Sequence, residues 1–205
     1  MARLKQSTHL KNCPPYSKVR CYFDTIITMT KYIAFLRGIG PGNPSMHNDK
    51  LRAVFEEIGL GKVRSVIASG NIIFESDKTD ILAIETEIEQ ALLSRLGFST
   101  TAIVRNEAQL QKLITANPFK GKTHGPTSYL LVTFTKKPTK LNFTLPYQPP
   151  DKPYTLIQMV DDTLFSVTDN TLIKTPDLMS WLEKQLGKAI SSRTWNTIIK
   201  ISQKF

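Results

Sequence analysis

The chain has 205 residues, of which 40% are apolar, and this is ample for a packed core, so the sequence predicts a globular protein. The formal net charge of +10 favours a polyanionic or phosphate-bearing partner, but five of the 27 basic and one of the 17 acidic side chains lie in residues 1–28. Residues 29–205 therefore keep 22 basic and 16 acidic side chains, a surplus well short of that of a dedicated nucleic-acid binder.

Residues 1–28 show neither a helical nor an alternating apolar period, and they contain two adjacent prolines. We interpret them as a poorly ordered N-terminal extension, with a strand over residues 21–27 at a sheet edge as the alternative. Both cysteines, Cys13 and Cys21, lie here, and their spacing matches neither a zinc site nor a disulfide framework. Because no apolar run approaches the length of a membrane span, we expect a cytoplasmic protein. Because the cysteine spacing fits no zinc site, we expect no bound metal.

The patterned part begins near Met29 and predicts a first half, residues 29–105, with the order strand, helix, strand, strand, helix, strand. The expected elements are strand 31–36, helix 45–58, strands 62–68 and 72–75, helix 80–96 and strand 100–105. The residues between the two middle strands, Ser69 to Asn71, have the composition of a tight hairpin turn or a bulge. This βαββαβ order is that of the ferredoxin-like motif, an antiparallel sheet with both helices on one face.

Residues 106–205 predict a second α+β half, which begins with a helix capped by Asn106. The expected elements are helix 106–116, strands 128–135, 156–160 and 164–167, helix 176–186, and a final helix over 191–199 capped by Ser191 or Ser192. Asp161 and Asp162 have the composition of a hairpin turn. A connector with five prolines over residues 136–153 is too long for an ordinary link, so it is either a functional flap or an inserted loop.

Four short motifs follow one another along the chain. They are Leu36 to Ile39, Ser69 to Phe74, Asn117 to Phe119, and Ser192 to Thr197. With these motifs, residues 29–205 resemble the bacterial family called domain of unknown function sixteen ninety-seven. The resemblance implies an α+β fold of two duplicated, intertwined ferredoxin-like halves, in a family with no established activity. The first loop of that family commonly runs Arg-Gly-Ile-Asn, whereas Gly40 stands here in place of the Asn.

The loop between the first strand and the first helix is a candidate anion site. Gly38, Gly40, Gly42 and Asn43 belong to it, and Arg37 precedes it. Its backbone N–H groups, the helix N-terminus and Arg37 together suit a phosphate or carboxylate. The glycine spacing excludes a dinucleotide fingerprint, and the lack of a Gly-Lys-Ser/Thr triplet excludes a P-loop. In the alternative interpretation, the glycines only make a tight turn and Arg37 pairs with a protein carboxylate.

Asn71 at the hairpin and Arg193 in the predicted final helix are further ligand-binding candidates. An amide at a tight turn more often satisfies the local backbone, so we favour the turn role for Asn71. A cation in the first helical turn needs a compensating anion, which for Arg193 is either a ligand or a protein carboxylate. The predicted ligand site comprises Arg37, Gly38, Gly40, Gly42, Asn43, Asn71 and Arg193.

No catalytic residue can be nominated from the sequence. His47 and His124 are the only histidines of the patterned part, and neither has the partners of a known nucleophilic site. The third strand lacks the aromatic rings of RNA-recognition modules, so the sheet is not expected to stack bases. We therefore favour a cytoplasmic domain that binds a small phosphate- or carboxylate-bearing ligand without a cofactor. Sequence-indifferent nucleic-acid binding and an enzyme with unassigned catalytic residues are the alternatives.

Overall fold

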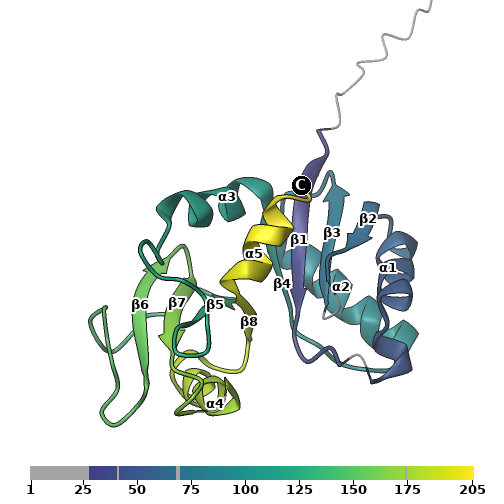
Figure 1. Cartoon of the computed structure of the whole chain (residues 1–205). Helices are drawn as coiled ribbons and strands as arrows, with labels where there is room; N and C mark the ends of the chain where they lie inside the picture. Colours follow the sequence, from purple (N-terminus) through teal and green to yellow (C-terminus); the bar gives the residue numbers. More distant parts are fainter. Residues whose placement is uncertain (1–27, 41, 68–69, 174) are drawn as a thin grey trace, which may run out of the picture.

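The computed structural model describes residues 28–40, 42–67, 70–173 and 175–205. In this part the chain forms five α-helices and two four-stranded antiparallel sheets, which makes it a mixed α+β protein (Figure 1). The predictions for residues 1–27, an extension or an edge strand, lie outside the described residues.

The first sheet has the strand order β2-β3-β1-β4. Its elements are β1 (Thr30–Leu36), α1 (Asn48–Glu57), β2 (Gly61–Ser65), β3 (Asn71–Ser76), α2 (Ile81–Leu96) and β4 (Ala102–Asn106). Alternate residues of β1, such as Tyr32 and Ala34, pack with α1 and α2 in one apolar cluster. The two helices therefore cover the same face of this sheet, which we call its outer face.

The second sheet has the order β6-β7-β5-β8, which repeats the first order strand for strand. Its half consists of α3 (Glu107–Ala116), β5 (Tyr129–Thr135), β6 (Tyr154–Val160), β7 (Thr163–Thr168), α4 (Thr175–Leu186), β8 (Ile190–Thr194) and α5 (Trp195–Ser202). The turn between β6 and β7 is made by Asp161 and Asp162, both with positive φ, as their composition predicts. The sequence therefore places this hairpin correctly, whereas Ser69 of the other predicted turn lies outside the described residues.

The proline-rich connector packs with α4 on one face of the second sheet, which we call the outer face of that sheet. Phe143 stacks on Tyr147 with 4.3 Å between ring centroids, and both rings lie near Trp181 of α4. Tyr147 also exchanges two backbone hydrogen bonds, of 2.8 and 2.7 Å, with Leu156 of β6. In chain order the connector stands where α1 stands in the first half, so here a loop takes the place of a helix.

The two sheets face each other across a shared apolar layer. Phe35 of β1 stacks directly on Phe134 of β5, with their ring centroids 4.2 Å apart. Leu110 of α3 and Ile198 of α5 belong to the same buried cluster. Figure 1 shows α5 lying between the two sheets. The halves are therefore joined by a continuous core, which buries the inner faces of both sheets.

Two predicted helices differ from the structure. Instead of one helix over 45–58, a short 3-10 helix at Pro44–Met46 precedes α1, because His47 between them is extended with ψ 148°. Instead of a helix over 191–199, residues Ile190–Thr194 form β8, which pairs with β5. The N-cap of α5 is Thr194, whose hydroxyl accepts a hydrogen bond from Thr197 N, so the prediction of Ser191 or Ser192 is wrong.

The caps of α2 and α3 suit their sequences. Asn106 caps α3 in a full capping box with Gln109, which confirms the predicted cap. Asp80 accepts hydrogen bonds from two backbone N–H groups at the start of α2, and Gly97 ends α2 in the left-handed conformation. Local capping chemistry therefore sets these helix ends.

A buried polar cluster adds to the contact between the halves. Lys136, next to the end of β5, places its Nζ 2.5 Å from Glu89 Oε1 and 3.8 Å from Glu85 Oε2, and both carboxylates belong to α2. Arg105 of β4 donates through Nη2 to the carbonyl oxygen of Thr135 at 2.7 Å. Because Glu85 is only 2% exposed, its charge depends on these neighbours.

Replacing Glu85 by glutamine is expected to flatten the pH dependence of the free energy of unfolding above the ordinary carboxyl pKa of 4.5. Burial raises the pKa of Glu85, and the Val104 N–H and Lys136 oppose this only in part. The folded chain thus holds the proton more tightly than the unfolded chain, so this contribution to stability is lost as pH rises through the raised pKa. Denaturant unfolding at several pH values checks this, with the exposed Glu57→Gln as control. Parallel profiles for wild type and Glu85→Gln would contradict it.

Candidate functional site

A cavity of about 520 Å³ lies between the two halves, and we call it the interhalf cavity. Four of the seven predicted site residues line it: Arg37, Gly38, Asn71 and Arg193. The other described lining residues are Ile67, Tyr129, Leu131, Met179, Glu183, Ile190, Ser191, Ser192, Thr194 and Thr197. Residues up to 160 positions apart in the sequence therefore meet at one place.

Arg37 is held by the second half. Its Nη2 lies 2.5 Å from Glu183 Oε1 on α4, and its Nη1 donates to the carbonyl oxygen of Lys188. The side chains of Arg37 and Glu183 are 31% and 27% exposed, so water reaches the pair. This arrangement matches the alternative interpretation from the sequence, in which Arg37 pairs with a protein carboxylate. A ligand anion at Arg37 has to compete with Glu183.

Arg193 lies in β8 and not in a helix, so the argument from the helix dipole does not apply to it. Its Nε donates to Asn71 Oδ1 at 2.5 Å, and its Nη2 donates to the Leu36 carbonyl oxygen at 2.8 Å. Its Nη1 donates to the Ser192 carbonyl oxygen at 2.7 Å and to Ser191 Oγ at 3.0 Å. Burial lowers the pKa of Arg193 to about 10, which leaves it charged at neutral pH. Arg193 therefore ties β8 of one half to β1 and β3 of the other.

Asn71 and Gly70 shape the turn beside this arginine. The Asn71 side chain is almost fully buried, and its Nδ2 donates to the Val66 carbonyl oxygen at 3.1 Å. Gly70 has φ +69°, and a Cβ at this position would lie 2.7 Å from Ile39 Cγ1 and 2.9 Å from Leu36 Cβ. Asn71 thus has the local backbone contact expected of a turn residue, and Gly70 allows the close approach of the turn to β1.

The rest of the glycine-rich loop lies away from the interhalf cavity. Gly40, Gly42 and Asn43 are not among the described residues that line it. Asn43 Oδ1 accepts a hydrogen bond from Ser45 N at 3.0 Å and so caps the short 3-10 helix. The Gly40 N–H points to Met46 Sδ at 3.4 Å. Ligand roles for the seven predicted residues remain predictions, and the structure assembles four of them.

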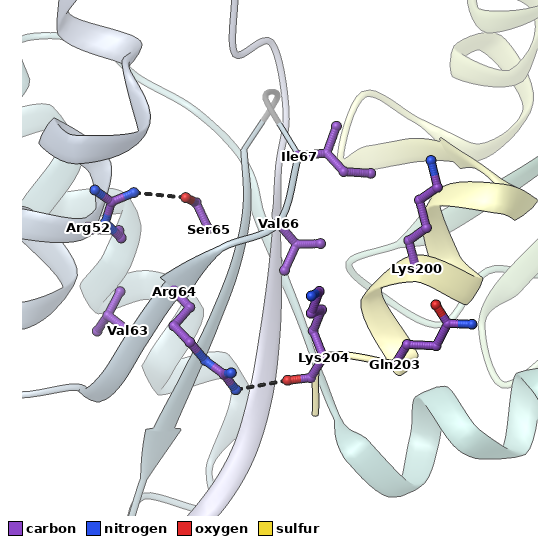
Figure 2. Close-up of a pocket in the computed structure, with 9 residues that line it drawn as sticks. All are labelled: Arg52, Val63, Arg64, Ser65, Val66, Ile67, Lys200, Gln203 and Lys204. Carbon is purple, nitrogen blue, oxygen red and sulfur yellow. Dashed lines mark hydrogen bonds between the residues drawn. The ribbon is translucent and has the colours of Figure 1, made fainter.

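A second cavity, of about 580 Å³, lies between β2 and the C-terminal end of α5, and we call it the basic groove (Figure 2). Its described lining residues are Arg52, Val63, Arg64, Ser65, Val66, Ile67, Lys200, Gln203 and Lys204. Four of these are cations, and neither aspartate nor glutamate stands among them. The groove is therefore a concentration of positive charge to which both halves contribute.

The cations of the basic groove have neutral neighbours. Arg52 Nη1 donates to Ser65 Oγ at 2.8 Å, and Arg64 Nη2 donates to the Lys204 carbonyl oxygen at 2.8 Å. Among the described residues, none of Arg52, Arg64, Lys200 and Lys204 has a carboxylate oxygen within 4.0 Å. Arg64 and both lysines are exposed, so an incoming anion can reach them.

The basic groove was not predicted from the sequence. Its cations come from α1, β2, α5 and the residues just after α5, and only the packing of the halves brings these segments together. A local signal does exist, because Lys200 and Lys204 lie four residues apart near the C-terminal end of α5 and Arg64 lies on a strand with another cation, Lys62. The spacing of cations along one helix or strand does not reveal which other element packs against it.

The described residues assemble no recognisable catalytic group. His124 accepts a hydrogen bond from Leu130 N through Nδ1, and its ring packs on Tyr129. No three histidine, cysteine, aspartate or glutamate side chains gather around a possible metal position in the part of the chain that the structure describes. None of the helices described is both long and apolar enough to cross a bilayer.

Comparisons with known proteins place the chain in an uncharacterised group. The family model described as "Protein of unknown function (DUF1697)" matches residues 29–165. No curated protein matches the chain. The chain is similar to the solved structure of the conserved bacterial protein SP0830 from Streptococcus pneumoniae, with 20% identity and a TM-score of 0.62. That match covers 86% of this chain and 98% of the other, and at this identity it supports the fold alone.

Proposed function

We propose that this chain, which belongs to the DUF1697 family of proteins of unknown function, binds an anionic ligand in the basic groove. The observation that carries the proposal is the set of four cations around one cavity, none with a carboxylate of the described residues within ion-pair distance. Like charges held together without a counter-charge attract anions from solution and strengthen their hydrogen bonds. The ligand class is one that bears several phosphate or carboxylate groups.

The basic groove is a better candidate for an anion than the interhalf cavity predicted from sequence. In the interhalf cavity, Arg37 faces Glu183 at 2.5 Å, and Arg193 donates to oxygens of the protein. In the basic groove, Lys200 lies in the last turn of α5 and Lys204 lies two residues beyond the helix, and both are exposed. An anion there gains charge-assisted hydrogen bonds without displacing a protein carboxylate.

Nucleic acid is the second candidate ligand, and the groove favours it less. The described lining residues include no aromatic ring on which a base could stack. A volume of about 580 Å³ falls in the range of small-ligand pockets, although the groove is open to solvent. Contacts to a nucleic acid here would involve the phosphates alone and would weaken steeply with salt.

The fold and location predicted from the sequence belong to the same proposal. The repeated strand order supports two duplicated ferredoxin-like halves, in which the proline-rich connector replaces one helix of the second half. A cytoplasmic location suits a ligand-binding domain of this kind. Neither expectation is needed for the anion site itself.

Reversing two charges in the basic groove, with Arg64→Glu and Lys200→Glu together, is expected to weaken tripolyphosphate binding at least about tenfold, because charge-assisted contacts become repulsive. Isothermal titration calorimetry at low salt measures the affinity. The double variant Lys137→Glu and Lys140→Glu is the matched control, since it changes the net charge equally on exposed residues of the connector.

Three outcomes are informative. Retained binding in the control and loss in the groove variant support the proposal. Equal weakening in both variants would mean that only the net charge matters. If Arg37→Ala loses tripolyphosphate binding and the groove variant keeps it, the ligand binds in the interhalf cavity, and this would contradict the proposal.

A further inference from the structure

The basic groove lies along an unpaired strand edge. In the described part of the first sheet, β2 has β3 on one side and no strand on the other. Val66, directly after β2, donates its N–H to the Asn71 carbonyl oxygen at 2.9 Å, so its backbone groups point toward β3. Because backbone groups alternate in direction along a strand, those of Ser65 and Val63 point toward the open side.

Cations flank this edge on both faces of the sheet. On the outer face, Ser65 accepts the hydrogen bond from Arg52 of α1. On the inner face, Arg64 donates to the carbonyl oxygen of Lys204, and Lys200 projects from α5. Figure 2 shows Arg52 on one side of β2 and Lys200 on the other. A strand added at this edge would therefore project alternate side chains toward positive charge on either face.

We propose that the anionic ligand of the basic groove is an extended acidic peptide segment of another protein, which adds a strand to the open edge of β2. This inference rests on the proposed function and deepens it, because it names the ligand class. Backbone hydrogen bonds to Val63 and Ser65 hold the segment, and its carboxylates contact Arg64 and Lys200 on the inner face or Arg52 on the outer face. The affinity comes from the main chain, and the charges select acidic sequences.

The length of the paired segment is set by irregular backbone at both ends of the edge. The register with β3 shifts between Gly61 and Arg64, and Lys62 has φ +47°. At the other end Ile67 has φ +62°, which is unusual for a β-branched residue, and the residue is 47% exposed. Pairing is thus confined to residues 63–66, and Ile67 offers an apolar contact where the segment leaves the edge.

Charge excludes two other occupants of this edge. A second copy of the chain would bring a basic groove against a basic groove. Residues 1–28 of the same chain carry five basic side chains and one acidic side chain, so they too would be repelled. Nucleic acid satisfies the charges, but it offers no amide backbone to the unpaired groups of Val63 and Ser65. An acidic peptide is the ligand that satisfies both the charges and the backbone.

The test uses the full chain and a fluorescein-labelled octapeptide in which glutamate and valine alternate. One derivative carries N-methyl groups on two successive glutamates of this alternating sequence, and the other carries them on two successive valines. All three probes therefore have the same charge. In an added strand, only one of these sets of N–H groups faces β2. Fluorescence anisotropy is expected to show one derivative binding at least about tenfold more weakly, because its backbone hydrogen bonds are lost. The other derivative is expected to bind like the parent peptide.

Equal binding of both derivatives, with competition by tripolyphosphate, would overturn strand addition and leave the proposed anion site intact. Tighter binding of a single-stranded DNA octamer than of the parent peptide would overturn the peptide as ligand in favour of nucleic acid. Binding of neither the peptide nor tripolyphosphate would overturn the proposed function as well. The groove variant Arg64→Glu with Lys200→Glu is expected to abolish binding of the parent peptide.

Discussion

Replacing Arg193 by methionine is expected to lower the free energy of unfolding by about 3 kcal/mol or more, because hydrogen bonds between the halves are lost together. The substitution removes the donors to Asn71 Oδ1 and to the carbonyl oxygens of Leu36 and Ser192. Asn71 is 1% exposed, so its amide oxygen would lack both this donor and water. Denaturant unfolding monitored by circular dichroism measures the loss.

The matched control for this prediction is Arg64→Met, which removes an exposed arginine with one hydrogen bond to the Lys204 carbonyl oxygen. Its expected cost is below about 1 kcal/mol, as for most exposed polar contacts. Arg193→Lys is expected to recover little, because an ammonium group cannot reproduce the planar fork. Equal stability of Arg193→Met and Arg64→Met would contradict the view that Arg193 joins the halves.

Replacing Gly70 by alanine is expected to cost about 3 kcal/mol of unfolding free energy, from backbone strain and steric overlap together. The backbone at Gly70 has φ +69°, and the new methyl group would lie 2.7 Å from Ile39 Cγ1 and 2.9 Å from Leu36 Cβ. The Gly70 carbonyl oxygen also accepts the Leu36 N–H at 2.8 Å, so the turn cannot move freely from β1. Thermal and denaturant unfolding measure the cost.

The variant Gly97→Ala separates the cost of backbone strain from the cost of steric overlap. Gly97 has φ +74°, but a Cβ there meets no atom within 4 Å, so only the backbone term applies, at about 1 kcal/mol. A cost for Gly70→Ala no larger than that for Gly97→Ala would show that β1 and the hairpin do not pack as described.

Much of the fold could be predicted because local patterns decide it. The periodicity of α2, the cap at Asn106 and the turn at Asp161 and Asp162 depend on neighbours in sequence, and each appears as expected. The strand β8 could not be predicted this way. Its residues include two serines and an arginine, a polar run typical of a helix start, and pairing with β5 makes it a strand.

The candidate site was harder to predict because its chemistry depends on packing between the halves. Arg37, Asn71 and Arg193, which the sequence predicts as members of one ligand site, line one cavity, but their pattern in the sequence gives no sign of Glu183 opposite Arg37. Nor could it show that Lys200 of α5 would face Arg64 of β2 across a groove. A charge is a binding candidate only after its neighbours are known.

A tripolyphosphate titration followed by backbone amide NMR is the decisive test of anion binding in the basic groove. Binding there is expected to cause chemical-shift changes that saturate and that concentrate at residues 63–67 and 200–204. Amides beside the interhalf cavity, at Gly38 and Glu183, are expected to change little. Saturable shifts centred on Gly38 and Glu183, with residues 63–67 and 200–204 unchanged, would contradict it.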